Sequence, residues 1–212
     1  MQTVVPMHLL SDPSILALAI VAVVVLGLAK GGFSGLGALA TPLLALALPP
    51  VTAAAMLLPI LLVQDVVSVW SFRKSWSGWT IGWMLPGAAL GVALAALFAA
   101  SVPEAHVLLL LGVITAAFGA YRLWAERGGR IVAPSSSPGW VGTLFGIATG
   151  FTSQIAHAGG PPFQMWVTPR KLPHQTFVGT SSITFAAINW MKVPSYILLG
   201  SMGHESWLQR VC

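Results

Sequence analysis

Long apolar runs separated by short polar connections make up most of the chain. Such a run must reach roughly 20 residues, usually 17–25, to cross about 30 Å of hydrocarbon as a helix. Most of the runs have that length, so the pattern predicts an all-α bundle of membrane-spanning helices. The runs cover residues 14–29, 33–48, 51–71, 79–100, 106–124, 138–156 and 174–199.

Two segments are shorter than the rest and carry glycine and proline: 33–48 and 158–169. Proline removes a backbone donor and breaks a helix interior. Interrupted backbone survives in a membrane only where protein or a water-filled cavity shields it. We therefore predict two broken or re-entrant helix segments. The interrupting residues are Gly35, Gly37 and Pro42 in the first segment and Gly159, Gly160, Pro161 and Pro162 in the second.

Composition narrows the class of protein. Hydrophobic residues make up 56% of the chain, charged residues make up 7%, and the mean hydropathy is +0.84. Soluble proteins carry about 25% charged residues. These values exclude a soluble enzyme, a nucleic-acid binder, a coiled coil and a disordered chain. The single cysteine, Cys212, excludes an intrachain disulfide and a cysteine metal cluster, and we expect neither a metal nor a cofactor.

The net charge of +5 comes from basic residues that lie between the apolar runs. Lys and Arg in such loops mark the cytoplasmic side of a membrane. The clusters at 73–74 and 122–130 are two spans apart, so they lie on the same side. Arg170 and Lys171 join them there only if both short segments count as crossings. The charges therefore predict a multi-pass protein with its N-terminus outside.

The two halves of the chain resemble each other around the short segments, at a shift of 119 residues. The first half contains five crossings, an odd number, so the second half must be inverted. Paired Gly/Pro-interrupted segments in inverted halves indicate the binding site of a transporter. The superposed pairs are Ser34 and Ser153, Pro42 and Pro161, and, after a small insertion, Asp65 and Asn189.

This repeat divides the chain into a first transmembrane repeat (1–124), a cytoplasmic linker (125–138) and a second inverted repeat (139–212). Under the same shift, the counterpart of 79–124 would extend past residue 212. We therefore expect a truncated second repeat. The alternative is a partner chain that supplies the missing helices.

Candidate site residues follow from the needs of a small oxyanion, which are N–H donors at helix ends, hydroxyl groups and limited positive charge. Asp65, the one acid well inside an apolar run, is the candidate coupling residue; its alternative role is an ion pair with Lys30 or Arg73. The predicted substrate-binding residues are Lys30, Ser34, Gly35, Gly37, Thr41, Pro42, Ser153, His157, Gly159, Gly160, Pro161, Asn189 and Lys192.

Structural roles remain open for several of these residues. Lys30 and Lys192 lie near run ends, so either side chain has the alternative of extending to the membrane surface. A lone histidine such as His157 is commonly a hydrogen-bonded structural residue. Glycine, serine and threonine in membrane helices commonly serve close packing or bond back to the preceding turn.

The motifs resemble those of a known family, the sulfite exporter TauE/SafE family, also called the four-toluene-sulfonate uptake permease family. The resemblance covers about residues 14–200. It implies a permease or exporter of sulfur-containing or organic anions, such as sulfite, sulfonates and sulfoacetate, in the bacterial cytoplasmic membrane. The motifs are Lys30-Gly31-Gly32-Phe33, Ser34-Gly35-Leu36-Gly37, Thr41-Pro42-Leu43-Leu44, Gly159-Gly160-Pro161-Pro162, Gly179-Thr180-Ser181 and Asn189-Trp190-Met191-Lys192-Val193-Pro194-Ser195-Tyr196.

Three other functions compete with a transporter. Gly32-Phe33-Ser34-Gly35 and Ala156-His157-Ala158-Gly159-Gly160 resemble segments of intramembrane serine proteases, but Ser34 and His157 lie 123 residues apart. An anion channel and a purely structural membrane subunit are the other two. We predict a transporter without enzymatic activity, whose partners are a small anionic substrate and the lipid bilayer, not nucleic acid. Assembly into a homo-oligomer is left open.

Overall fold

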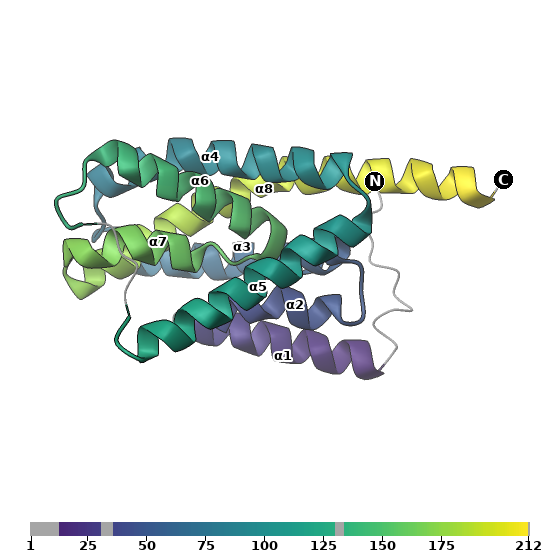
Figure 1. The fold of residues 1–212 in the computed structure, drawn as a ribbon, viewed down its shortest axis with the longest axis horizontal. Coiled ribbons are helices and arrows are strands. Elements are labelled where there is room, and N and C mark those ends of the chain that lie inside the picture. Colours follow the sequence, from purple (N-terminus) through teal and green to yellow (C-terminus); the bar gives the residue numbers. More distant parts are fainter. Residues whose placement is uncertain (1–12, 31–35, 130–133, 212) are drawn as a thin grey trace.

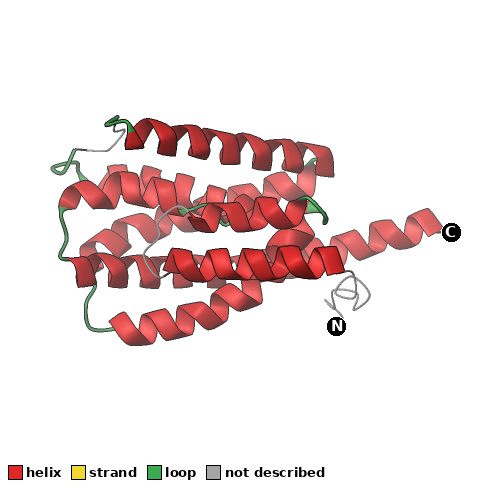
Figure 2. Cartoon of the chain, turned by 90° about the horizontal axis from the view of Figure 1, so that it is seen from below, coloured by secondary structure: helices red, strands yellow, loops and turns green. Residues whose placement is uncertain are grey.

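The computed structural model describes residues 13–30, 36–129 and 134–211, and every regular element in these ranges is helical. Figure 2 shows the helices and their short connections. The prediction of an all-α fold is thus confirmed. The elements are α1 (Pro13–Lys30), η2 (Leu36–Leu39), α2 (Ala40–Ala45), α3 (Pro50–Phe72), α4 (Gly78–Ser101), α5 (Glu104–Glu126), α6 (Gly139–Ala156), α7 (Gly160–Val167), η3 (Thr168–Arg170) and α8 (His174–Val211).

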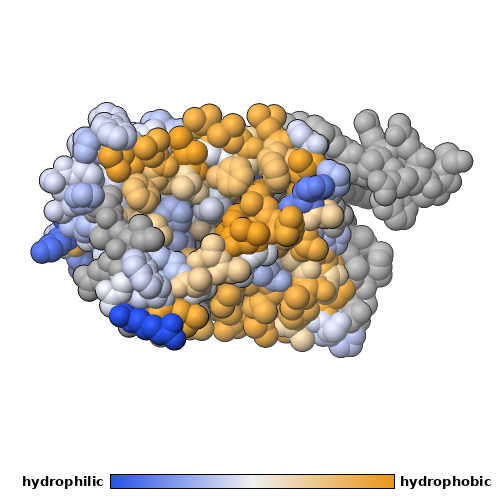
Figure 3. All heavy atoms as spheres, viewed as in Figure 1, coloured by the Kyte–Doolittle hydropathy of each residue, from blue (hydrophilic) through white to orange (hydrophobic). Residues whose placement is uncertain are grey.

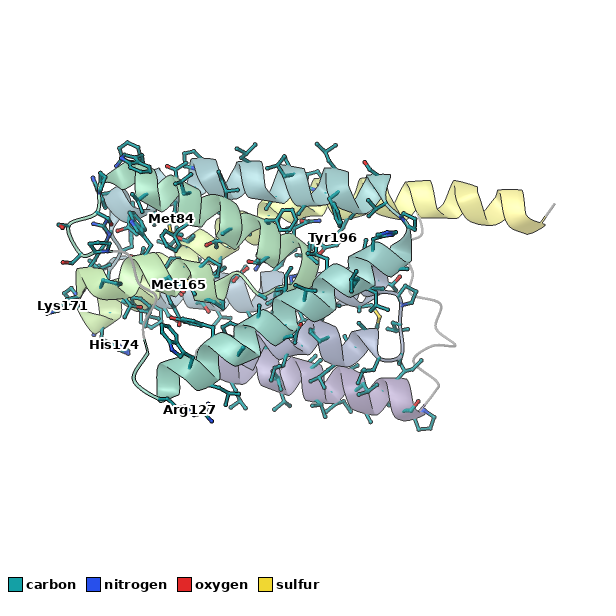
Figure 4. The ribbon with its side chains drawn as sticks, viewed as in Figure 1. Met84, Arg127, Met165, Lys171, His174 and Tyr196 are labelled. Atoms are coloured by element: carbon teal, nitrogen blue, oxygen red, sulfur yellow. The ribbon has the colours of Figure 1, made fainter. Side chains whose placement is uncertain are left out.

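The helices run back and forth along the long axis of the molecule, and α5 crosses the others obliquely (Figure 1). Arg127, Lys171 and His174 lie at one end, well away from Tyr196 (Figure 4). The Arg73–Lys74 connection is at the same end, because the Ser77 amide next to it donates to Thr180 Oγ1 of α8 at 2.9 Å. This common end is the one that the sequence predicts to be cytoplasmic.

The outer surface of the bundle is largely apolar. Residues Thr52–Phe72 of α3 and Gly78–Ser101 of α4 are long and apolar enough to cross a membrane, yet only 33% and 39% of their apolar windows are buried. Figure 3 shows a broad hydrophobic surface on one face, with hydrophilic residues gathered toward one end. An apolar surface of this extent needs lipid or protein to cover it. The shape and surface agree with a membrane protein.

Helices α4 and α6 approach each other closely through glycines. A Cβ placed on Gly87 or Gly91 of α4 would collide with a backbone carbonyl oxygen of α6. A Cβ on Gly146 or Gly150 of α6 would collide with a carbonyl oxygen of α4. The four-residue spacing of these glycines is the small-residue pattern that lets membrane helices pack backbone to backbone. These glycines therefore serve packing.

The order of a long helix, a short interrupted helix and a second long helix occurs twice, as α1–α2–α3 and as α6–α7–α8. In Figure 1 each element of the first set runs opposite to its counterpart in the second. The inverted symmetry and the domain boundaries stay predictions. Helix α8 continues to Val211, past the predicted end at 199, because polar residues extend a helix without extending its apolar run.

Candidate functional site

A chain of hydrogen bonds runs through the bundle between α3 and α8. Asn189 Nδ2 donates to Asp65 Oδ2 at 2.6 Å, and Lys192 Nζ donates to Asn189 Oδ1 at 2.9 Å. Lys192 Nζ also lies 2.9 Å from His157 Nδ1. Asp65, Asn189 and Lys192 are 2%, 3% and 0% exposed. We call these four residues the polar network; all four are candidates from the sequence.

The hydrogen bonds of His157 define its protonation. The carbonyl oxygen of Ala54 lies 2.9 Å from Nε2, and a carbonyl oxygen only accepts. Nε2 must therefore carry a hydrogen. In the neutral ring Nδ1 is then the acceptor, and it receives a hydrogen bond from the Lys192 ammonium. The network thus links a carboxylate, an amide, an ammonium and a neutral imidazole in that order.

His157 follows helix α6 in a left-handed backbone conformation, and this conformation directs its ring into the polar network. Helix α6 ends at Ala156, and His157 has φ 52° and ψ 25°, the left-handed conformation that usually belongs to glycine. The amides of His157 and Ala158 donate back to the carbonyls of Ser153 and Thr152 at 3.1 and 3.2 Å. A side chain in this conformation costs roughly 1 kcal/mol or more. Such strain at a buried polar cluster favours a functional role.

Helix α6 ends at Ala156 and α7 begins at Gly160, and α7 offers fewer backbone donors than we expected. Pro161 and Pro162 occupy its first turn and have no N–H. The amide of Phe163 donates to the Gly159 carbonyl at 3.4 Å. Only the amides of Gly159 and Gly160 remain for a ligand in that turn. Anion binding here depends on side chains more than on the helix end.

Other predicted site residues have different positions. Ser153 lies one turn before His157 and is 2% exposed, whereas Gly37 and Pro42 are half-buried on η2 and α2 and have no contact with the polar network among the described interactions. Thr41 is 0% exposed, and its hydroxyl has no hydrogen-bond partner in the part of the chain that the structure describes. Ser34, Gly35 and the side chain of Lys30 lie outside the described residues.

The end of α2 lies near the second break. Ala45 packs against the buried cluster formed in part by Ile155, Ala156 and Ala158. Thr41 is one helical turn before Ala45 and so shares its side of α2. The short helix of the first half therefore reaches the residues around His157.

The alternative role of Lys192 as a side chain that extends to water is wrong, because the residue is 0% exposed. Arg73, one alternative partner of Asp65, instead donates to the Trp70 carbonyl at 2.7 Å and lies over the Trp70 ring. The protease alternative would need a serine hydroxyl bonded to the ring of His157. Nε2 of that ring instead contacts the Ala54 carbonyl, and Nδ1 contacts Lys192 Nζ. No serine hydroxyl bonds to the ring among the described residues, and Ser34 lies outside them.

Sequence reasoning missed a second group beside the network. Gln154 Nε2 donates to Ser195 Oγ at 2.9 Å, and the Tyr196 hydroxyl donates to the Gln154 carbonyl at 2.6 Å. Ser195 Oγ donates to the Lys192 carbonyl at 2.7 Å. Gln154 is 3% exposed, and its Oε1 has no partner among the described residues. The sequence did contain a signal for this group, because Gln154 is a polar residue in an apolar run, one turn before His157.

Comparison with known proteins adds an independent finding. A family model described as "Sulfite exporter TauE/SafE" matches residues 18–209, nearly the whole chain. No curated protein and no solved structure matches it. The chain belongs to the sulfite exporter TauE/SafE family, a family of membrane transporters.

Proposed function

We propose that this chain carries small sulfur-containing or organic anions, such as sulfite or sulfonates, across the bacterial cytoplasmic membrane by alternating access. One observation carries the proposal beyond family membership. The polar network places a fully buried lysine in the interior of an apolar bundle, hydrogen-bonded by residues from two helices. Ionisable groups at such depth are costly and typically mark a substrate or ion pathway.

The chemistry of the network suits an oxyanion. The Lys192 ammonium is a charged donor that contacts Asn189 Oδ1 and His157 Nδ1. An arriving oxyanion would accept hydrogen bonds from this ammonium and replace the weaker bond to the imidazole. Charge-assisted bonds of this kind are about twice as strong as neutral ones. Gly159 and Gly160 amides and the Thr41 hydroxyl are the further donors that we assign to the site.

Residues from both halves form the network, and this supports alternating access. Asp65 and the Ala54 carbonyl belong to α3, whereas His157 directly follows α6, and Asn189 and Lys192 belong to α8. Asp65 and Asn189 are also the pair that the shift in sequence makes equivalent. Residues exchanged by a two-fold axis contact each other only near that axis. Rocking of the halves would therefore break and remake these bonds, with Asp65 acting in coupling as the negative charge of the network.

The test is a flux screen with the full chain in proteoliposomes, using sulfite, thiosulfate, methanesulfonate and sulfoacetate. Saturable uptake of at least one anion, absent from protein-free vesicles, is the expected result. No response to any of the four anions would refute the substrate class. Unitary currents that grow linearly with voltage would instead establish the channel alternative.

A further inference from the structure

The ionisable groups around the half-buried His157 carry balanced charges. Asp65 faces the network from α3, and Lys192 faces it from α8. Tyr196 of α8, the other titratable group near it, bonds to the Gln154 carbonyl on α6. Within the described residues, α6 and α7 add no charged side chain around His157. With an ionised Asp65, a charged Lys192 and a neutral His157, this described cluster has no net charge.

A second proton on His157 is incompatible with the observed contact. Nε2 already donates to Ala54, so a further proton would make Nδ1 a donor as well. That donor would then face the Lys192 ammonium across 2.9 Å, with two like charges and no acceptor between them. Like charges at such a distance strongly disfavour double protonation. While Lys192 is charged and keeps this position, His157 can therefore take a second proton only when something negative lies between the two groups.

We propose that His157 takes up a transported proton, and that it does so only when the substrate anion lies between its ring and Lys192. The inference rests on the proposed function and specifies its coupling. One monoanion and one proton travel together, and no net charge crosses the membrane. The proton moves onto Nδ1 of His157 as the Lys192–Nδ1 hydrogen bond breaks, and it leaves from Nδ1 when the anion departs. Asp65 stays ionised throughout.

Charge accounting favours a monoanion. The empty cluster is neutral, a monoanion alone makes it negative, and a monoanion with one proton restores neutrality. A dianion with one proton would leave a buried negative charge, which is costly in a low-dielectric interior. The site thus selects sulfonates and hydrogen sulfite over fully ionised sulfite. Binding of anion and proton must also reinforce each other equally, because linkage is reciprocal.

The experiment measures the affinity for methanesulfonate between about pH 5 and pH 8, the range in which histidine titrates. Methanesulfonate is a permanent monoanion, so any pH dependence comes from the protein. We expect affinity to rise as pH falls, by up to about tenfold per pH unit, the limit for one linked proton. His157→Gln should bind with a flat pH profile. His174→Gln, at an exposed histidine at the far end of the bundle, should keep the full slope.

A second measurement uses the unaltered protein. Uptake should acidify the vesicle lumen by one proton per anion and should not respond to a potassium-valinomycin potential, whereas alkalinisation of the lumen would overturn the inference. A voltage-dependent rate would overturn the inference, whatever the variants do. The same holds if His157→Gln keeps the slope, or if Asp65→Asn removes it while His157→Gln does not. These results leave sulfonate transport intact, whereas a wild-type chain that binds no sulfur anion refutes both proposals.

Discussion

Two cations in the second half of the chain, the buried Lys192 and the half-buried Arg170, are held by different kinds of groups. Lys192 is 0% exposed, and its described partners are the Asn189 amide and the His157 ring. The Arg170 guanidinium lies 4.5 Å from the Trp79 ring and 4.2 Å from the Trp166 ring, at the end of the bundle. It also donates to the Ser137 carbonyl at 2.8 Å. One cation lies among groups that can change charge, and the other among groups that cannot.

This difference separates a chemical role from a structural one. Arg170, on η3, joins the segment before α6, α4 and α7 through two aromatic faces and a backbone carbonyl, none of which titrates. Partial burial lowers the pKa of its guanidinium, but arginine stays protonated at neutral pH, so the charge is constant there. Lys192 joins the two halves through residues whose bonds depend on protonation. We infer that Arg170 stabilises the end of the bundle that the sequence predicts to be cytoplasmic, while Lys192 acts on the proposed substrate.

The largest expected effect is at Lys192. In Lys192→Met the network loses its ammonium, and the anion loses its charged donor. Truncating a buried hydrogen-bonded charge typically costs 2–5 kcal/mol, so sulfonate uptake should fall by at least about 30-fold. The measurement is the initial uptake rate per folded protein in proteoliposomes. Lys171→Met, at an exposed lysine in the connection before α8, is the matched control. Equal rates for both variants would remove Lys192 from the site.

Asp65 and Lys192 should depend on each other for stability. Asp65→Asn leaves the buried ammonium without its compensating charge, and Lys192→Met does the same to the carboxylate; each is expected to destabilise the fold by about 3–5 kcal/mol. The double variant should be less destabilised than the sum of the singles, with a coupling of about 1–3 kcal/mol. Thermal unfolding in detergent measures the cycle. Additive effects would show that Asn189 does not connect the two charges.

Substitutions at Arg170 should affect stability and leave transport unchanged. Arg170→Ala removes two aromatic contacts and the bonds to Ser137, which together predict a loss of about 2 kcal/mol. Arg170→Lys keeps the charge but not the planar stacking, so it should recover about half of that loss. Unfolding temperature is the readout, with Arg127→Ala as an exposed control. A change in the pH slope of sulfonate binding would break the distinction between the two cations.

Sequence reasoning found the network because polar residues are rare within apolar runs. Asp65, His157 and Lys192 stood out for that reason, and Asn189 was singled out as the counterpart of Asp65 in the predicted repeat. The sequence could not predict the hydrogen bonds between these residues, since Asp65 and Asn189 lie 124 residues apart. The repeat made those two positions equivalent but said nothing of contact. The positions of the helices followed from hydropathy alone.

Three other features of the structure were not predicted from the sequence, each for a physical reason. Arg170 was assigned only as a topology signal, because its stacking partners lie on other elements and sequence distance hides them. The sequence analysis expected more backbone N–H donors at the start of α7 than the helix offers, because two prolines without an N–H occupy that turn. The glycines of α4 and α6 have a readable four-residue spacing, but only their partner helix shows that backbone approach, and not a ligand, requires them.

The smallest expected effect is at Ser137, whose hydroxyl accepts from Arg170 Nη2 at 3.1 Å and from Trp166 Nε1 at 3.2 Å. Ser137→Ala removes this shared acceptor while the Ser137 carbonyl still holds the guanidinium. A loss of about 1 kcal/mol is expected, as for one net hydrogen bond, with uptake and its pH slope unchanged. Ser136→Ala, at an exposed neighbour, is the control in thermal unfolding. If Ser137→Ala slowed uptake without lowering stability, the Arg170 cluster would belong to the transport path, and the two cations would not differ in role.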